Sequence, residues 1–285
     1  MNPKVIFTDS GLGGLTIMAD FVSLAKEHNL SVDTTFFNAQ YSRELGYKKM
    51  ESAEQVRVFD RVLESIQKKY QPDVIAIACN TLSVVYKKTA FSKNSKIQVL
   101  DIIKVGQSLI NHSDSNTIIE VAMPTTISSK IYKNDSKNRI AISSDVMLPD
   151  AIENGNDDKI TTMLSNIFAK ANAKYQKKGY SNSKTALFLG CTHFPLIKDQ
   201  FLAFAKQKGI SIQEILDPNQ AFSQLVLSEL NKTKKTTDLQ INPVQVISRM
   251  PFQDAEIKNI AKLIETQSKE TADGLCTYTL DESLF

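Results

Sequence analysis

Two of the chain's three cysteines occur in similar local patterns, each with an apolar run, then the cysteine, then two polar residues. A lone free cysteine is most often a small buried apolar residue. A thiol that lies between hydrogen-bonding side chains is a better candidate for a reactive thiolate, which can accept a proton and return it. The two patterns are Ile75 to Thr81, which contains Cys79, Asn80 and Thr81, and Leu187 to His193, which contains Cys191, Thr192 and His193.

The same residues allow other chemistry. A zinc site could use Cys79, Cys191 and His193, but the chain has only three histidines and no C-x-x-C motif, and we identify no fourth ligand. A cysteine hydrolase could use His193 as the base for Cys191, but no third group that would orient the histidine is evident from the spacing. A purely structural role for both cysteines is the remaining alternative.

A glycine-rich turn from Asp9 to Leu15 is expected between the first strand and the first helix. Its backbone N–H groups and the helix N-terminus can hold an anion. The turn matches neither G-x-G-x-x-G nor a lysine-containing P-loop, and a simple glycine turn is the alternative. Because Asp9 and Ser10 end the strand, we expect them to meet a ligand, with Asp9 receiving an ammonium group. An acidic side chain beside an anion-binding turn favours a zwitterionic ligand, which carries both an ammonium group and a carboxylate.

Short β-branched runs alternate with longer amphipathic segments, which is typical of α/β proteins with parallel sheets. Helical spacing of apolar residues predicts helices over Leu15 to Lys26 and around Val56 to Ile66. In open parallel sheets, ligands bind at the carboxyl ends of the strands. The expected strands are Val5 to Phe7, Thr34 to Phe37, Asp73 to Ala78, Ile97 to Ile103, Thr117 to Ala122, Arg139 to Ser143, Thr185 to Leu189 and Ile210 to Leu216.

The repeated cysteine pattern predicts two pseudosymmetric parallel-sheet α/β domains, with the active site in the crevice between them. We expect residues 1–98 and 208–285 to form the first domain and residues 99–207 to form the second.

The carboxyl-terminal tail is expected to return to the first domain. Its two strand-like runs and one helix are too few to bury a core alone. These elements are Leu239 to Ile247, Asp254 to Gln267 and Leu275 to Leu280.

Composition narrows the class of protein. The 285 residues carry 34 Lys and Arg against 31 Asp and Glu, a net charge of +3, so nothing demands a nucleic acid partner. The densest basic patch, Lys232, Lys234 and Lys235, is expected to be a solvated helix end. No apolar run is long enough to span a membrane, and the cysteines are too few for a disulfide framework. We therefore expect a cytoplasmic protein with free thiols.

Three blocks of the sequence resemble those of the glutamate racemase family, within the cofactor-independent aspartate/glutamate racemase superfamily. Phe7 to Leu15 resembles the family's F-D-S-G-x-G-G-L block. Ala78 to Thr81 resembles its A-C-N-T block, and Leu189 to Leu196 its L-G-C-T-H-[YF]-P-L block. Weaker similarity extends the match to about residues 4–225.

The resemblance implies an amino acid racemase that uses neither pyridoxal phosphate nor metal, with glutamate as the substrate and peptidoglycan synthesis as the use of its product. In that family pattern Cys79 takes the α-proton of the D-enantiomer and Cys191 that of the L-enantiomer. Asp9 lies near the first thiol, and Glu153 and His193 lie near the second. The resemblance assigns substrate binding to Asp9, Ser10, Leu45, Gly46, Asn80, Thr81, Thr126, Thr192 and His193.

Two departures from the family concern the substrate. Leu45 and Met123 stand where the family usually has a tyrosine and a threonine, although Tyr41 or Tyr47 could restore a hydroxyl. A racemase for aspartate or another amino acid is therefore an alternative. A catalytically silent amino acid binding or regulatory protein on the same scaffold is another, with a homodimer as the candidate assembly in each case.

Overall fold

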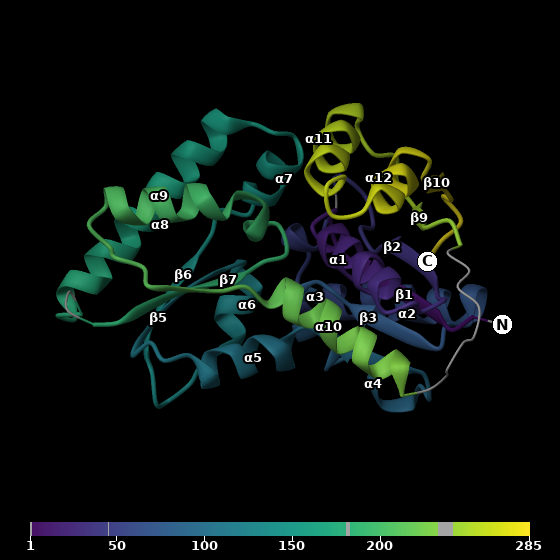
Figure 1. Cartoon of the computed structure of the whole chain (residues 1–285), viewed down its shortest axis with the longest axis horizontal. Helices are drawn as coiled ribbons and strands as arrows, with labels where there is room; N and C mark the ends of the chain where they lie inside the picture. The colour runs from purple at the N-terminus through teal and green to yellow at the C-terminus, as the bar shows by residue number, and fades with distance from the viewer. Residues whose placement is uncertain (1, 45, 181–182, 233–241) are drawn as a thin grey trace. The chain divides into compact units, whose positions relative to one another are not determined.

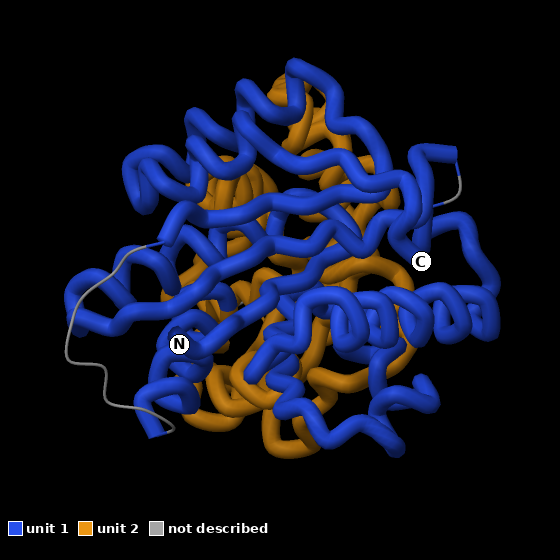
Figure 2. Tube along the Cα trace, turned by 90° about the vertical axis from the view of Figure 1, so that its right-hand side faces the viewer, with its two compact units in different colours: residues 1–102, 219–285 blue, residues 103–218 orange. Residues whose placement is uncertain are grey.

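The chain forms two compact units, which Figure 2 distinguishes by colour. Unit 1 combines residues 1–102 with residues 219–285, and unit 2 comprises residues 103–218. None of the helices within the described part of the chain has the length and apolar character needed to cross a membrane. The computed structural model describes residues 2–44, 46–180, 183–232 and 242–285.

The strands of unit 1 form one parallel sheet, ordered β10-β9-β2-β1-β3-β4 within the described residues. Phe7 and Phe21 pack on the face that α1 covers, with ring centroids 5.2 Å apart. The strands are β1 (Lys4–Asp9), β2 (Asp33–Asn38), β3 (Val74–Ile77), β4 (Gln98–Asp101), β9 (Gln245–Ser248) and β10 (Thr279–Leu280).

Helices cover both faces of this sheet (Figure 1). The group of α1, α11 and α12 packs together on one side, and α2 packs with α3 and α4 on the other. A short 3-10 helix, η1, precedes α2. The bounds are α1 (Gly14–Glu27), η1 (Tyr47–Lys49), α2 (Ser52–Tyr70), α3 (Asn80–Tyr86), α4 (Phe91–Asn94), α10 (Pro218–Asn231), α11 (Asp254–Ile264) and α12 (Lys269–Cys276).

Unit 2 contains a smaller parallel sheet with the order β6-β5-β7-β8. Helices α8 and α9 lie on one face and α5 and α6 on the other (Figure 1). The bounds are α5 (Ile103–His112), β5 (Thr117–Ala122), α6 (Pro124–Ser129), β6 (Asn138–Ser143), α7 (Leu148–Glu153), α8 (Asp157–Lys177), β7 (Thr185–Gly190), η2 (Phe194–Ile197), α9 (Lys198–Gln207) and β8 (Glu214–Leu216).

The unit boundaries differ from the expected 1–98 with 208–285 and 99–207. The first unit continues to Ile102 because β4 pairs with β3. The segment after residue 207 stays in unit 2 as far as Pro218, because β8 pairs with β7. The mixed α/β class with two parallel sheets is confirmed.

The tail extends the sheet of unit 1, since β9 pairs in parallel with β2. The expected strand from Leu275 to Leu280 is largely wrong: α12 continues to Cys276, and only Thr279–Leu280 is a strand. The Ser268 side chain caps α12 by accepting a hydrogen bond from the Thr271 N–H, and this cap favours the helix. The expected strand from Leu239 begins outside the described residues. Lys234 and Lys235 of the basic patch also lie outside them.

The last residues of the sequence pack into the apolar cluster of unit 1. Leu284 is buried, and the Phe285 ring centroid lies 5.8 Å from that of Phe37. The Arg249 guanidinium lies over the ring of Tyr41, 4.5 Å from its centroid, and its Nη1 donates a hydrogen bond to the Leu284 carbonyl. The end of the chain is thereby tied to the segment that follows β2.

Candidate functional site

Cys79 lies two residues after the end of β3 and is the N-cap residue of α3. Its Sγ accepts a hydrogen bond from the Leu82 N–H at 3.5 Å and lies 3.4 Å from the Ser10 Oγ. The side chain is buried. A helix N-terminus and a hydroxyl both favour negative charge, so these surroundings suit a thiolate.

Asp9 ends β1, which pairs with β3, so the carboxylate and Cys79 lie at the carboxyl ends of neighbouring strands. The Asp9 Oδ1 accepts a hydrogen bond from the Gly11 N–H at 3.3 Å. A Cβ added at Gly14 would lie 2.8 Å from the Asp9 Cβ, closer than real Cβ contacts. Glycine at this position therefore lets α1 begin directly against the acid.

Two further residues of the predicted site, Asn80 and Thr81, begin α3, and both are buried. Asn38 ends β2 opposite Asp9 in the neighbouring strand β1, and its Nδ2 donates to the Gly11 carbonyl at 3.2 Å. Nothing in the sequence blocks singles out Asn38. Its position at a strand end is the signal that could have identified it.

The loop after β2 is held by side-chain contacts. Arg43 forms a bidentate ion pair with Glu256 of α11, at 2.8 and 2.7 Å. Gly46, a predicted substrate-binding residue, lies next to Gln40 and is the N-cap residue of η1. The other predicted residue of this loop, Leu45, lies outside the described residues.

A second group of predicted residues lies in unit 2 and is a chain of three side chains. The Cys191 Sγ lies 3.6 Å from the His193 Nδ1, and the His193 Nε2 lies 2.7 Å from the Glu153 Oε1. All three residues are buried. Glu153 supplies the orienting third group that the sequence spacing did not reveal, because α7 carries it to the histidine.

The charge state of His193 follows from these contacts. Burial alone disfavours the imidazolium, but the hydrogen bonds to Cys191 and Glu153 and the negative charge of both partners outweigh it, so the pKa of His193 is raised well above its usual range. The three side chains form a hydrogen-bonded chain with a carboxylate at one end and a thiol at the other.

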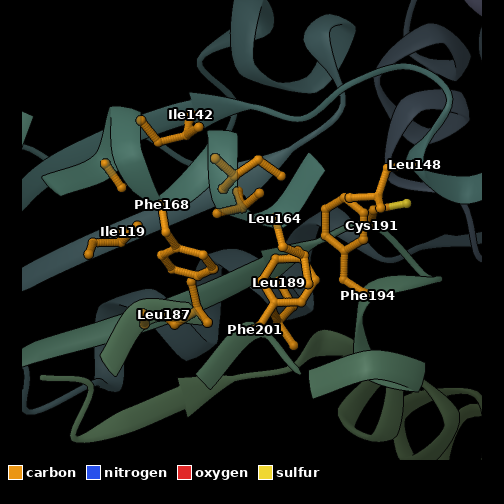
Figure 3. Packing of buried hydrophobic residues seen from close by; sticks show 14 of the residues in the cluster. Ile119, Ile142, Leu148, Leu164, Phe168, Leu187, Leu189, Cys191, Phe194 and Phe201 are labelled. Atoms are coloured by element: carbon orange, nitrogen blue, oxygen red, sulfur yellow. The ribbon is translucent and has the colours of Figure 1, made fainter. Parts of the chain in front are cut away.

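Cys191 follows β7 and lies at the end of the apolar cluster of unit 2, beside Leu148 (Figure 3). Gly190 precedes it, and a Cβ there would lie 2.7 Å from the Ala122 Cβ of β5. Glycine at this position therefore lets β5 and β7 lie close together at their carboxyl ends, next to Cys191. Phe194 closes the turn, since its N–H donates to the Cys191 carbonyl at 3.1 Å.

The remaining predicted residues of unit 2 are Thr126 and Thr192, and both are buried. Thr126 lies in the first turns of α6, which follows β5. Met123 is the N-cap of α6 but caps nothing with its side chain. Its Sδ lies 3.4 Å from the Ser144 Oγ, which donates to it.

The structure thus groups the predicted residues by unit. Asp9, Ser10, Gly46, Cys79, Asn80 and Thr81 belong to unit 1, and Thr126, Glu153, Cys191, Thr192 and His193 belong to unit 2. Within the described ranges, no group of three or more His, Cys, Asp or Glu residues is arranged to hold a metal ion.

Comparisons with known proteins agree with this architecture. No model of a protein family matches the chain. A glutamate racemase of Shewanella sp. (strain MR-4) is 24% identical over 292 residues, covering 99% of this chain and 94% of the relative. The crystal structure of glutamate racemase from Francisella tularensis subsp. tularensis SCHU S4 in complex with D-glutamate superposes with a TM-score of 0.73 and 23% identity, covering 93% of this chain and 94% of that one. Picrophilus torridus aspartate racemase gives a TM-score of 0.52 and 18% identity, covering 81% and 95%.

The two parallel α/β units, each with a cysteine shortly after a strand, have the fold of these racemases. The resemblance to the glutamate racemase family that the three sequence blocks predict is confirmed, because relatives 24 to 26% identical to this chain are glutamate racemases.

Proposed function

We propose that this amino acid racemase interconverts D- and L-glutamate, with Cys79 and Cys191 as its two acid/base groups. The observation that carries the proposal is the pair of thiols after β3 and β7, each with partners that suit negative charge. Glutamate is the substrate because the chain resembles glutamate racemases over nearly its whole length, and one of them was crystallised with D-glutamate.

In the direction from D to L, the Cys79 thiolate takes the α-proton, and the C–H electron pair stays on the α-carbon as a carbanion. The Cys191 thiol then gives its proton to the opposite face of that carbon. In the reverse direction the two cysteines exchange roles. The α-proton is far less acidic than a thiol, whose ordinary pKa is about 8.5, and each unit of mismatch costs about 1.4 kcal/mol.

The half-sites therefore have to stabilise charge. In unit 2 the imidazolium of His193, oriented by Glu153, balances the negative charge of Cys191. In unit 1 the Ser10 hydroxyl and the first turn of α3 do the same for Cys79. Asp9 would receive the ammonium group of the substrate, and buried polar residues such as Thr126 would receive its carboxylates.

Aspartate is the nearest alternative substrate, since an aspartate racemase shares the fold. Leu45 and Met123 both replace polar side chains of the family. A carboxylate that lacks one hydroxyl donor loses about 1 to 3 kcal/mol of binding. If these positions set specificity, Leu45→Tyr together with Met123→Thr should raise kcat/KM for glutamate relative to less polar amino acids.

The decisive experiment is α-hydrogen exchange in heavy water, followed for both enantiomers of a panel of amino acids. We expect deuterium at the α-carbon of glutamate from either enantiomer, together with formation of the opposite one, and less with aspartate. Activity that is lost on chelation and restored by zinc would contradict the two-thiol mechanism. Exchange that is faster with aspartate would assign the alternative substrate.

One observation favours a second candidate. A Cys191–His193–Glu153 chain is also the arrangement of a cysteine nucleophile with its base and orienting acid. Such a hydrolase would have no use for the thiol of Cys79. Hydrolysis of amide or ester substrates that survives in Cys79→Ser would favour this function over racemisation.

A further inference from the structure

The side chain of Asn38 is buried, and both ends of its amide are hydrogen-bonded. Asn38 is only 1% exposed. Its Nδ2 donates to the Gly11 carbonyl at 3.2 Å, and its Oδ1 accepts from the Gln40 N–H at 2.9 Å. A carbonyl can only accept and an N–H can only donate, so these two partners fix the orientation of the amide. Asparagine at this position therefore links two separate segments of backbone.

The first of these segments is the glycine-rich turn after β1. The Gly11 peptide is bound on both sides, because its N–H donates to the Asp9 Oδ1 at 3.3 Å and its carbonyl accepts from Asn38. Ser10 lies between Asp9 and Gly11 in the chain, and its Oγ lies 3.4 Å from the Cys79 Sγ. Asn38 thus fixes the backbone next to the residue that carries this hydroxyl.

The second segment is the loop after β2. The Asn38 oxygen binds the backbone of Gln40 at the start of this loop. The side-chain amide of Gln40 packs against Gly46, where an added Cβ would lie 3.1 Å from the Gln40 Nε2. The loop is therefore fixed by the same side chain as the turn.

The pairing of β1 with β2 places Asn38 between the two segments. Asp9 and Asn38 are the last residues of their strands and lie opposite each other in the register. The Ala39 N–H donates to the Asp9 carbonyl at 2.7 Å. Beyond this point the chain leaves the sheet on both sides, and the Asn38 amide connects turn and loop where the strands no longer do.

We propose that Asn38 is a positioning residue for Cys79 and that it acts through Ser10. Its hydrogen bond to the Gly11 carbonyl keeps the Ser10 hydroxyl within reach of the Cys79 sulfur. When Cys79 is a thiolate, the hydroxyl is the donor, and a charged acceptor makes this a strong hydrogen bond. The inference rests on the proposed role of Cys79 as a base. Both partners of the Asn38 amide are backbone groups, so its effect on the sulfur passes through the turn.

The test uses the full chain without substrate and follows the pH dependence of alkylation by iodoacetamide, resolved by peptide mass spectrometry. In Ser10→Ala we expect the midpoint for Cys79 to rise by about one to two pH units, the worth of one charge-assisted hydrogen bond. Asn38→Ala should raise it by a smaller amount, because the hydroxyl remains but is no longer fixed. The midpoint for Cys191 in the same samples should not move.

A double-mutant cycle shows whether Asn38 acts through Ser10. The variant that combines Asn38→Ala with Ser10→Ala should have the same Cys79 midpoint as Ser10→Ala alone, because the hydroxyl that Asn38 positions is already absent. A general structural role of Asn38 would instead add its own shift to that of Ser10→Ala. Shifts that add would therefore overturn the proposal.

Asn38→Asp keeps the test decisive even if the alanine variant folds poorly. Aspartate has nearly the same shape and can still accept from the Gln40 N–H, but a carboxylate cannot donate to the Gly11 carbonyl. Its added negative charge raises the Cys79 midpoint in any background. We therefore expect a larger shift for Asn38→Asp in the parent than in Ser10→Ala, and equal shifts would overturn the proposal.

Thr8→Val is the matched control. The Thr8 Oγ1 donates to the Phe37 carbonyl at 2.9 Å, one position earlier in the same pair of strands. The variant loses a buried hydrogen bond between β1 and β2 but leaves the contacts of the turn in place. We expect a lower heat stability, as in Asn38→Ala, and an unchanged Cys79 midpoint. A shift as large as that of Asn38→Ala would assign the effect to the strands rather than to the turn, against the proposal.

An unchanged Cys79 midpoint in both Asn38 variants would overturn the proposal. An unchanged midpoint with a raised KM for glutamate would overturn it in favour of a role of Asn38 in the loop after β2. If no amino acid exchanged its α-hydrogen, the proposed function would fail, while the thiol measurements would still decide the link from Asn38 through Ser10 to Cys79.

Discussion

At the scale of single residues, the two cysteines divide the proposed reaction into halves that can be measured separately. We expect Cys79→Ser and Cys191→Ser each to lower racemisation by about 10² to 10⁴-fold, the usual contribution of a positioned acid or base. Cys191→Ser should still exchange the α-hydrogen of D-glutamate, and Cys79→Ser that of L-glutamate. Enantiomer-resolved exchange in heavy water checks this.

Cys276→Ser is the control for that experiment, since Cys276 is exposed and lies in α12. It should racemise at the parent rate. Near-parental racemisation by Cys79→Ser or by Cys191→Ser would contradict the two-base assignment. Exchange of the same enantiomer by both variants would contradict the assignment of one enantiomer to each cysteine.

The raised pKa of His193 also predicts a dependence of stability on pH. Its protonated form is favoured in the folded state, so its contribution is fully present below the ordinary histidine pKa of about 6.5 and is lost as the pH rises through the raised value. Glu153→Gln should therefore destabilise the protein most at pH values just below the ordinary histidine pKa of about 6.5, where the imidazolium is fully formed. The loss should be of the order of 3 kcal/mol and should shrink at alkaline pH.

Urea unfolding of the parent and of Glu153→Gln, compared over that range of pH, checks the sign. Asp150→Asn is a suitable control, because Asp150 lies on the same helix α7. A difference between parent and Glu153→Gln that grows toward alkaline pH would mean that the imidazole is neutral in the folded protein.

At the scale of elements, α11 steadies the loop that carries Gly46. The carboxylate of Glu256 is almost fully buried and receives both nitrogens of Arg43. It also accepts a hydrogen bond from the Gln253 N–H as part of the capping box of α11. Glu256→Gln removes one charge of this pair and should leave the loop less ordered.

If the loop binds substrate, the expected result for Glu256→Gln is a several-fold higher KM for glutamate with a smaller change in kcat. Asp273→Asn, which disrupts the exposed pair of Lys269 and Asp273 in α12, should change neither constant. Steady-state kinetics of the parent, Glu256→Gln and Asp273→Asn check both expected results. An equal loss of kcat and no change in KM would assign the ion pair to something other than substrate binding.

The elements themselves were largely predictable from local sequence. The run Thr117–Ala122 is β-branched and apolar, and it forms β5 with the predicted bounds. Both cysteines follow strands as expected, because an apolar run that ends in polar residues carries its own signal.

Contacts between elements were less predictable. The link from His193 to Glu153 joins η2 to α7, and the sequence spacing alone gave no reason to pair them. The last strand of unit 2, β8, is short, so only its pairing with β7 decides which sheet it joins. The two hydrogen bonds of the Asn38 amide likewise become visible only once the ends of β1 and β2 are placed side by side.

At the scale of the whole molecule, each unit carries one cysteine and its own charge-stabilising partners. We predict that the two cysteines act within one chain. Mixing Cys79→Ser with Cys191→Ser should then leave racemisation at the level of the separate variants, even if the protein is a homodimer. Sedimentation of the mixture establishes the assembly, and recovery of activity on mixing would instead mean that a substrate meets thiols from two chains.

The packing of the last residues has a practical consequence for handling the protein. Leu284 is buried, and its carbonyl is bound by Arg249, whose guanidinium also lies over Tyr41 and Phe285. An affinity tag or fluorescent reporter fused directly after Phe285 would therefore disturb the contacts of Arg249 with Tyr41, Leu284 and Phe285, which anchor the segment following β2. A fusion at the other terminus, or one separated by a long glycine-rich spacer, is the design that leaves this anchorage undisturbed.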